Sequence, residues 1–304
     1  SVTSQAIMRI VPQPGKIVEG DVTFYRYGDD GSVEKVELTN LDPRGPEIRS
    51  IRGNEIAKIF QEPMTSLSPV HTIGNQIMEA IILHQKVDKA EAREKAIEML
   101  AHVGLPQPQE RIDSYPHQLS GGMRQRAMIA MALSCHPSLL IADEPTTALD
   151  VTIEAQILEL LEDLQAEFGM SILYISHDLA VVGGIADDVM VMYLGLVMEH
   201  APVETVFDDP LHPYTRALWR SIPKIDGPLE SLVPISGAMP SPFAQQPGCP
   251  FYSRCTEAKT GICDVALPAL TEVHPGHSVR CFLYDDAVEG EPDIGSVETM
   301  VRSR

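Results

Sequence analysis

Apolar residues along the chain occur either in short continuous runs or at helical spacing. Continuous runs, which are typical of strands buried on both faces, occupy residues 139–142, 171–175 and 188–193. Helical spacing is found between these runs, over residues 151–168 and 179–186. Strands that alternate with helices favour a mainly parallel sheet covered by helices, and therefore an α/β fold.

The first 70 residues mix a helix with strand-like pieces. Residues 2–10 have the pattern of a helix, whereas Glu19–Phe24 and Ile56–Phe60 have the pattern of strands. No internal repeat is visible in this part of the chain or beyond it.

Residues from about 72 to 134 are mostly helical by pattern. The segment 89–100 is rich in strong helix formers, with apolar residues at helical spacing. Asp88 precedes it as a candidate N-cap, and Glu91 follows three residues later as in a capping box. We therefore expect a helical subdomain over about 72–134.

Composition changes after Trp219, where prolines become frequent and the pattern is that of loops and turns. The last stretch, 285–304, is acidic and poor in aromatic residues, so we expect a disordered tail there. The sequence thus predicts a larger α/β domain over 1–210, a small loop-rich module over 211–284, and the acidic tail.

Length and charge narrow the function classes. The chain has 304 residues, 44% hydrophobic residues and a formal net charge of −20. No apolar run approaches the ~20 residues that a membrane-spanning helix needs, so a membrane role requires a partner protein. The negative charge argues against non-specific nucleic-acid binding.

The stretch Leu119–Asp150 is the most informative part of the sequence. Ser120, Gly121 and Gly122 open a helical pattern within it. The N–H groups and the positive dipole at a helix N-terminus attract anions, and glycine lets a phosphate approach the backbone. These residues therefore indicate a phosphate site.

A second device follows in the same stretch. The strand-like run 139–142 ends in Asp143 and Glu144, and the turn Ala148–Asp150 precedes the next helix. Paired acids at the end of a buried strand suit Mg²⁺ binding beside a base that positions water. The Ser-Gly-Gly sequence alone also fits an ordinary surface helix, and the Asp-Glu pair alone also fits solvated acids. The complete string of features in this order fits neither alternative.

Together these residues resemble the ATPase subunits of ABC transporters. The HPYTRAL string at 212–218 and the cysteine-bearing tail are similar to one branch of this family, the dipeptide and oligopeptide importers. Other residues correspond to the remaining motifs of the family. Residues 119–123 resemble the signature motif, and residues 139–144 resemble Walker B followed by the catalytic glutamate. The turn ending at Asp150 resembles the D-loop, Gln61 the Q-loop glutamine, and His177 the switch histidine.

The resemblance implies a role for each site residue, with ATP as substrate and Mg²⁺ as cofactor. Asp143 is expected to hold Mg²⁺, and Glu144 to orient the attacking water and accept its proton. His177 is expected to contact the γ-phosphate, and Gln61 to couple metal and water to the helical region. Ser1 stands where the family has a Mg²⁺-ligating hydroxyl. Phosphoryl transfer needs positioning and charge neutralisation more than covalent chemistry, which suits these residue types.

One family motif is missing. The sequence contains no G-x-x-G-x-G-K-[ST] loop, the Walker A motif, and Ser1 begins where that motif would end. We interpret the sequence as a shortened chain, with a naturally degenerate subunit as the alternative. The sequence as printed therefore predicts no appreciable ATPase activity by itself, since the phosphate-binding backbone and lysine are missing.

Four of the five cysteines cluster in the tail with the spacing C-x5-C-x7-C-x17-C. Cytosolic thiols stay reduced, which disfavours disulfides. A loop-rich module this small is too small to build its own core, which suggests that a bound metal stabilises it as a structural staple. Zinc sites usually contain C-x2–4-C pairs, which are absent, while a [4Fe–4S] cluster accepts varied spacing. The family resemblance also implies the cluster; zinc or no metal remain alternatives. The cysteines concerned are Cys249, Cys255, Cys263 and Cys281.

The resemblance also implies partners. A second, related ABC ATPase would pair with this chain as a heterodimer, so that Ser120, Gly121 and Gly122 face the partner's ATP. Asp150, in the D-loop, is also expected to be a cofactor-binding residue. Two transmembrane permease subunits and an extracytoplasmic solute-binding protein would complete an importer at the cytoplasmic face of the membrane, with no nucleic acid involved. Alternatives are a catalytically silent subunit that supplies only the signature motif, an importer of nickel or another peptide-like solute, and a soluble ABC ATPase acting on DNA or ribosomes.

Overall fold

The computed structural model describes residues 1–28, 30–61, 66–147, 149–221, 235–241 and 247–284. The chain forms two compact units, one ending at Asp178 and the other beginning at Leu179. The acidic tail predicted over 285–304 lies outside the described residues. None of the helices in the described part of the chain has the length and apolar character required to cross a membrane.

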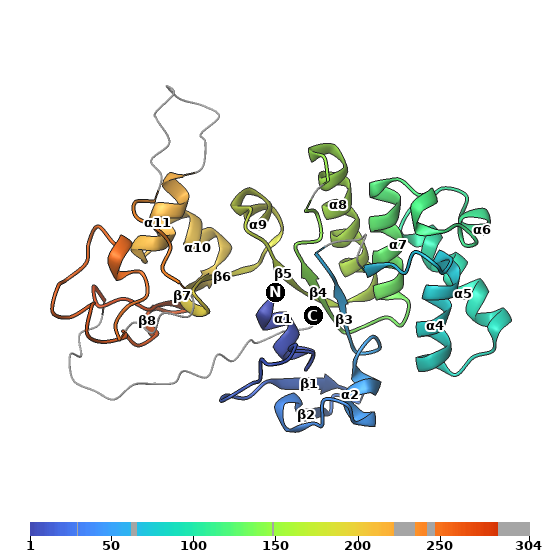
Figure 1. Cartoon of the computed structure of the whole chain (residues 1–304), viewed down its shortest axis with the longest axis horizontal. Helices are drawn as coiled ribbons and strands as arrows, with labels where there is room; N and C mark the ends of the chain where they lie inside the picture. The colour runs from blue at the N-terminus through green and yellow to red at the C-terminus, as the bar shows by residue number, and fades with distance from the viewer. Residues whose placement is uncertain (29, 62–65, 148, 222–234, 242–246, 285–304) are drawn as a thin grey trace. The chain divides into compact units, whose positions relative to one another are not determined.

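The first unit contains a sheet, a hairpin and helices (Figure 1). Its strands are β1 (Thr23–Tyr27), β2 (Val33–Glu37), β3 (Ile56–Ile59), β4 (Leu139–Asp143) and β5 (Ser171–Ile175). Its helices are α1 (Val2–Ile7), η1 (Leu38–Asn40), α2 (Pro46–Ile51), α4 (Ile73–Gln85), α5 (Lys89–His102), α6 (Pro108–Arg111), η2 (Pro116–Gln118), α7 (Gly121–Leu133) and α8 (Val151–Phe168).

The central sheet of this unit is parallel, in the order β3-β4-β5. Side chains alternate between its two faces, as strand geometry requires. Ala57 and Leu140 join the core shared with α4, α5, α7 and α8. Ile56 and Ile141 face the opposite way and pack with residues of α1, the β1–β2 hairpin and α2. The parallel sheet that the sequence predicted through 139–142 and 171–175 is confirmed.

The predicted helical region 72–134 contains α4 to α7, which lie together on one side of the first unit in Figure 1. The carboxylate of Asp88 accepts hydrogen bonds from the backbone N–H groups of Ala90 and Glu91, both at 2.9 Å. Asp88 is therefore the N-cap of α5, as its position before the helix-forming run predicted.

The second unit contains a four-stranded antiparallel sheet in the order β6-β7-β9-β8. Helices α9, α10 and α11 contribute side chains to a core with β6 and β7. The elements are α9 (Leu179–Ile185), β6 (Asp188–Tyr193), β7 (Leu196–Pro202), α10 (Val203–Asp208), α11 (Pro213–Arg220), η3 (Tyr252–Arg254), β8 (Thr271–His274) and β9 (His277–Val279).

Strand β6 is where the structure differs from the sequence prediction. The run 188–193 was expected to continue the parallel sheet, but it pairs antiparallel with β7. Leu194 and Gly195 both have positive φ and connect the two strands through a tight turn, so β6 finds its partner immediately after it in sequence. The compact units also divide earlier than residue 210. The functional domain limits 1–210 and 211–284 stay predictions.

Candidate functional site

Three residues predicted to act on nucleotide gather beyond the carboxyl ends of the parallel strands. Gln61 follows β3, Glu144 follows β4 and His177 follows β5. The Gln61 side-chain amide donates a hydrogen bond to Glu144 Oε2 at 2.8 Å, and His177 Nδ1 lies 3.5 Å from the same oxygen. Parallel strands bring such distant residues to one edge, where open α/β sheets commonly bind ligands.

Glu144 is held by further contacts of its side chain and backbone. Thr147 Oγ1 donates to Glu144 Oε2 at 3.0 Å, and the Glu144 N–H donates to the Ile175 carbonyl at 2.9 Å. The backbone φ of Glu144 is +50°, in the left-handed region that glutamate rarely adopts. Strained backbone of this kind is concentrated at functional sites. The carboxylate is thus directed toward Gln61 and His177 rather than along the strand.

Asp143 is 2% exposed and sits beside Glu144 at the end of β4. Its Oδ1 accepts from Ser1 Oγ at 3.0 Å, and its Oδ2 accepts from Ser4 Oγ at 2.9 Å. Lys58 Nζ forms an ion pair with Oδ2 at 2.8 Å. Burial acts to raise the pKa of Asp143, but the hydrogen bonds from Lys58, Ser4 and Ser1 outweigh it and lower the pKa below its usual value.

A polar pocket of about 450 Å³ opens beside Asp143. Its walls come from Ser1 and α1, from β3 and the segment after it, and from the end of β4. It has room for phosphate groups and a hydrated metal ion. The residues that line it are Ser1, Gln5, Lys58, Phe60, Gln61, Ser66 and Asp143. Ser1, Gln61 and Asp143, the three residues predicted to serve Mg²⁺, therefore border one cavity.

The predicted phosphate site at Ser120 lies at the N-terminus of α7. Ser120 is the N-cap, and its Oγ accepts from the Met123 N–H at 3.3 Å. The first-turn N–H groups of Gly121 and Gly122 have no acceptor within the helix. Gly121 is exposed, and a Cβ added there would meet no atom within 4 Å, so a ligand could approach the backbone.

Asp150 stands at the start of α8, exposed to solvent. Its carboxylate accepts from the Ile153 N–H at 3.1 Å, which makes it the N-cap of that helix. Among the described residues, neither the Asp150 carboxylate nor the Ser120 hydroxyl is hydrogen-bonded to Glu144 or Asp143. Neither residue lines the polar pocket.

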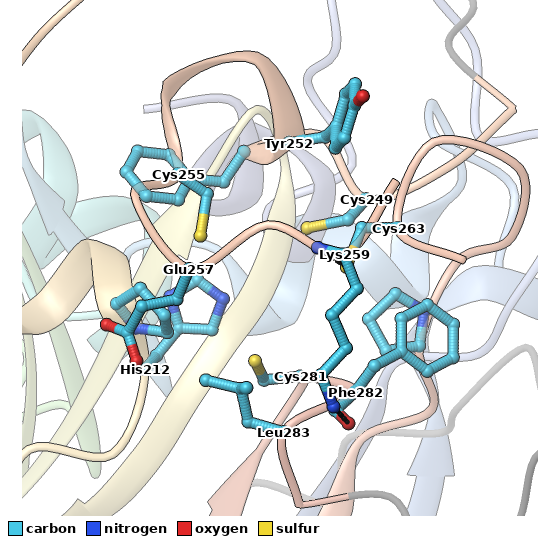
Figure 2. A pocket seen from close by; sticks show the side chains of 13 residues that line it. His212, Cys249, Tyr252, Cys255, Glu257, Lys259, Cys263, Cys281, Phe282 and Leu283 are labelled. Carbon is cyan, nitrogen blue, oxygen red and sulfur yellow. Dashed lines mark hydrogen bonds between the residues drawn. The ribbon is translucent and has the colours of Figure 1, made fainter. Parts of the chain in front are cut away.

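The four tail cysteines line one pocket in the second unit (Figure 2). The free volume of this pocket is about 20 Å³. It is surrounded by Cys249, Cys255, Cys263 and Cys281. Gly248 brings two of the cysteine segments together, because a Cβ added there would stand 2.3 Å from the Cys263 carbonyl oxygen. The pocket is therefore formed by close approach of two loops.

Backbone N–H groups are directed at all four sulfur atoms. Lys259 N–H donates to Cys263 Sγ at 3.4 Å. Burial raises the pKa of Cys281 to about 11 and also raises the pKa of Cys249 and of Cys255. Hydrogen bonds from backbone N–H groups oppose each of these shifts, from Phe251 and Tyr252 to Cys249, from Glu257 to Cys255, and from Leu283 to Cys281.

Within the described ranges, no three His, Cys, Asp or Glu side chains are arranged to hold a single metal ion. The four sulfurs nevertheless share one pocket with N–H donors around it. The donor set suits a soft metal group, which thiolates prefer. The arrangement does not correspond to four thiolates converging on one zinc ion at about 2.3 Å.

A buried carboxylate anchors the HPYTRAL segment. Glu199, on β7, accepts from the backbone N–H groups of Leu211 at 2.6 Å and His212 at 3.0 Å. His277 Nε2 lies 2.8 Å from Glu199 Oε1, so β9 is connected to the same group. His212 in turn caps α11 by accepting from the Tyr214 N–H at 2.9 Å.

Sequence reasoning missed several of these residues. Lys58 could have been noticed, because a lysine in the apolar run Ile56–Phe60 requires a charged partner when buried. Ser4 follows Ser1 by three residues and so shares its helix face. Thr147 and Glu199 gave no signal that could have been used, since a threonine in a turn and a glutamate in a strand have many ordinary roles.

Comparison with protein families gives two matches within the chain. Residues 7–147 match the ABC transporter family, and residues 198–263 match the C-terminal region of oligopeptide/dipeptide transporters.

Known proteins similar to this chain extend over nearly all of it. The oligopeptide transport ATP-binding protein AppD of Bacillus subtilis (strain 168) is 50% identical over 287 residues, which are 94% of this chain and 84% of the relative. The dipeptide transport ATP-binding protein DppD of Escherichia coli (strain K12) is 45% identical over 298 residues, 97% and 86% of the two chains.

A solved structure is similar in fold. It is the ATP-binding cassette MJ0796 as a dimer in a post-hydrolysis state bound to ADP and Pi, with a TM-score of 0.53 and 28% identity. The similarity covers 66% of this chain and 80% of that one. The α/β fold expected from the sequence is that of an ATP-binding cassette.

Proposed function

Because the chain belongs to the ABC transporter ATP-binding proteins, in the oligopeptide/dipeptide branch, we propose that it is the ATPase subunit that powers peptide uptake through a membrane importer. The observation that carries the proposal is the meeting of Gln61 and His177 on one carboxylate, Glu144, beside the buried Asp143. Permease subunits in the membrane are the partners that such an ATPase drives, from the cytoplasmic side.

Glu144 would be the base that orients and deprotonates the attacking water. Its Oε2 already accepts from Gln61 and Thr147, so the carboxylate is fixed before substrate arrives. Preorganised groups of this kind need no rearrangement during the reaction. His177, whose side chain is exposed, would contact the γ-phosphate.

Asp143 and Ser1 would hold Mg²⁺, with Gln61 at the edge of the same pocket. The fit is supported by the oxygen donors that border this cavity, since Mg²⁺ prefers carboxylate, hydroxyl and water oxygens. The ion supplies charge neutralisation of the transferring phosphoryl group. The surrounding side chains hold the ion and the water in place.

The exposed N-terminus of α7 would bind the nucleotide held by a second ATPase subunit. Its surface position supports this assignment, because Ser120 does not line the chain's own polar pocket. We propose a related but distinct partner, giving a heterodimer in which Ser120, Gly121, Gly122 and Asp150 face the interface. An extracytoplasmic binding protein would deliver the peptide.

Cys249, Cys255, Cys263 and Cys281 would bind a [4Fe–4S] cluster as a structural staple. Each thiolate of such a cluster binds a different iron, and the four sulfurs border one space. Backbone N–H groups directed at the sulfurs oppose the burial that raises the pKa of Cys249, Cys255 and Cys281. The free space is about one water in size, so loading requires the loops to separate slightly.

Replacing Glu144 by Gln tests the ATPase assignment, in the subunit with a Walker A sequence joined ahead of Ser1. General-base catalysis contributes about 10²–10⁴ in rate, so steady-state hydrolysis is expected to fall by at least about a hundredfold. ATP binding, measured by calorimetry, is expected to persist because Asp143 is unchanged. A fall in hydrolysis of less than about tenfold would contradict the role of Glu144.

Iron and acid-labile sulfide analysis after anaerobic purification tests the cluster. The wild-type chain is expected to contain both in equal amounts, about four per chain. Cys255→Ser is expected to lose them and the brown colour, while Cys135→Ser, at the end of α7, keeps them. Stoichiometric zinc without sulfide would instead assign a zinc site, and four free thiols without metal would remove the staple.

A further inference from the structure

Lys58 is a buried cation that no part of the proposed mechanism uses. Its side chain is 3% exposed, although it belongs to β3, an edge strand of the three-stranded sheet. Lysine is almost never buried unless it is paired. The partner is Asp143, whose Oδ2 lies 2.8 Å from Nζ. This pairing places an ammonium directly on the carboxylate that would bind Mg²⁺.

Strand geometry determines where Lys58 points. Ala57 and Ile59 face the core with α4 and α7, so Lys58 and Ile56 face the opposite side, toward α1. There Lys58 Nζ donates to Ser4 Oγ at 2.6 Å. Ser4 Oγ itself donates to Asp143 Oδ2 at 2.9 Å, so Lys58, Ser4 and Asp143 each contact the other two. The ammonium is therefore fixed by two partners rather than loosely placed.

The contacts of Asp143 leave little capacity for a metal ion. Oδ2 accepts from both Lys58 and Ser4, and Oδ1 accepts from Ser1. A divalent cation at this carboxylate would stand close to the ammonium, and like charges a few ångströms apart repel strongly in a partly buried site. Metal and ammonium thus compete for the same oxygen atoms.

We propose that Lys58 is the resident counter-ion of the Mg²⁺ site: it occupies the cation's place on Asp143 until the metal enters, and leaves when the metal binds. The inference rests on the proposed function of Asp143 as a Mg²⁺ ligand. It makes Mg²⁺ alone a weak ligand of this protein, because binding requires the displacement of an ion pair.

The displaced ammonium of Lys58 can move into the polar pocket. Lys58 lines this cavity of about 450 Å³ together with Gln61 and Ser66. Nζ also lies 5.0 Å from the centroid of the Phe60 ring, which is 42% exposed at the cavity edge. Nucleotide phosphates entering the pocket would attract the ammonium, so that Lys58 exchanges a carboxylate for a phosphate as Mg²⁺ binds. Metal and nucleotide would then bind cooperatively.

The test measures Mn²⁺ binding to the nucleotide-free 304-residue chain by electron paramagnetic resonance, without any turnover. Lys58→Gln removes the positive charge but keeps an N–H that can donate to Asp143. We expect it to bind Mn²⁺ at least about tenfold more tightly than the wild type. Lys58→Met is expected to show the same gain, and adding Asp143→Asn to either variant is expected to abolish it.

Lys95→Met is the matched control, because Lys95 pairs with Glu91 on an exposed face of α5. It is expected to leave Mn²⁺ affinity unchanged. A folded Lys58→Gln chain that binds Mn²⁺ no more tightly than the wild type overturns the proposal. If Lys58→Gln does not fold by circular dichroism, folding on addition of Mn²⁺ supports the proposal, and persistent unfolding counts against it. Mn²⁺ binding that is indifferent to Asp143→Asn in every background instead refutes the metal role of Asp143, which belongs to the proposed function.

Discussion

The polar site of the first unit is carried by the ends of strands, whereas the cysteine pocket of the second unit is carried by loops. Gln61, Glu144 and His177 follow three neighbouring parallel strands, so the sheet itself sets their spacing. Cys249 and Cys263 come together where their loops touch at Gly248, and the Cys249 N–H donates to the Cys263 carbonyl at 2.8 Å. The difference teaches that the first site depends on regular hydrogen-bonded structure, and the second on a few specific contacts and on any group bound between them.

Gly248→Ala is expected to have the largest effect on this comparison. The added Cβ would stand 2.3 Å from the Cys263 carbonyl oxygen, so the two loops must separate. We expect the second unit to lose about 3 kcal/mol or more of stability, measured by hydrogen exchange of its amides. Gly121→Ala, where a Cβ meets nothing within 4 Å, is the matched substitution in the first unit and should cost little. Equal losses in the two variants would contradict the proposed dependence on loop contact.

Mild acid is expected to destabilise the second unit more than the first, where burial also lowers the pKa of His84. Burial lowers the pKa of His212 from 6.5 to about 4, so folding favours its neutral form. The resulting stability is complete above pH 6.5 and is lost as the pH falls toward 4, by about 2 kcal/mol at pH 5. The pKa of Asp143 is lowered from 3.8, so its contribution is lost only below that pH.

Amide exchange at pH 7 and pH 5 separates the two units in one experiment. His212→Asn keeps a residue type that can cap α11 but removes the titrating ring, so it should abolish the difference between the two pH values. A similar loss of protection in both units at pH 5, or persistence of the effect in His212→Asn, would show that another group is responsible.

Thr147→Val is expected to have the smallest effect, since the strand ends still position Glu144. It removes the hydroxyl that donates to Glu144 Oε2 at 3.0 Å, while Gln61 still donates to the same oxygen. We expect hydrolysis by the Walker A-containing subunit to fall by roughly tenfold, equivalent to about 1.4 kcal/mol. Thr147→Ser retains the hydroxyl and should restore most of the rate. A loss as large as that of Glu144→Gln would mean that the strand ends alone do not place the carboxylate.

Much of the first unit could be predicted because its signals are local. The apolar runs 139–142 and 171–175 and the cap Asp88 each depend on neighbouring residues, and each is confirmed. The motif resemblance directed attention to Gln61, Glu144 and His177, which the structure brings together. Their chemical roles stay predictions.

The remainder depended on contacts between distant residues. The partner of Lys58 lies 85 positions later in the chain, at Asp143, and nothing near either residue indicates the pairing. Strand β6 has the composition of a buried parallel strand, yet the turn at Leu194 and Gly195 gives it an antiparallel neighbour. The short strands β8 and β9 follow a proline-rich segment that indicated only loops.

The carboxylate of Glu199 has a practical consequence for anyone who shortens this protein. It is fully buried and accepts hydrogen bonds from Leu211 and His212, while His277 contacts it from β9. A chain that stops before residue 277 would keep the glutamate and lose one of its three partners, leaving an under-solvated charge beneath the HPYTRAL segment. Expression boundaries drawn at the end of the cassette should therefore either extend past β9 or replace Glu199 as well.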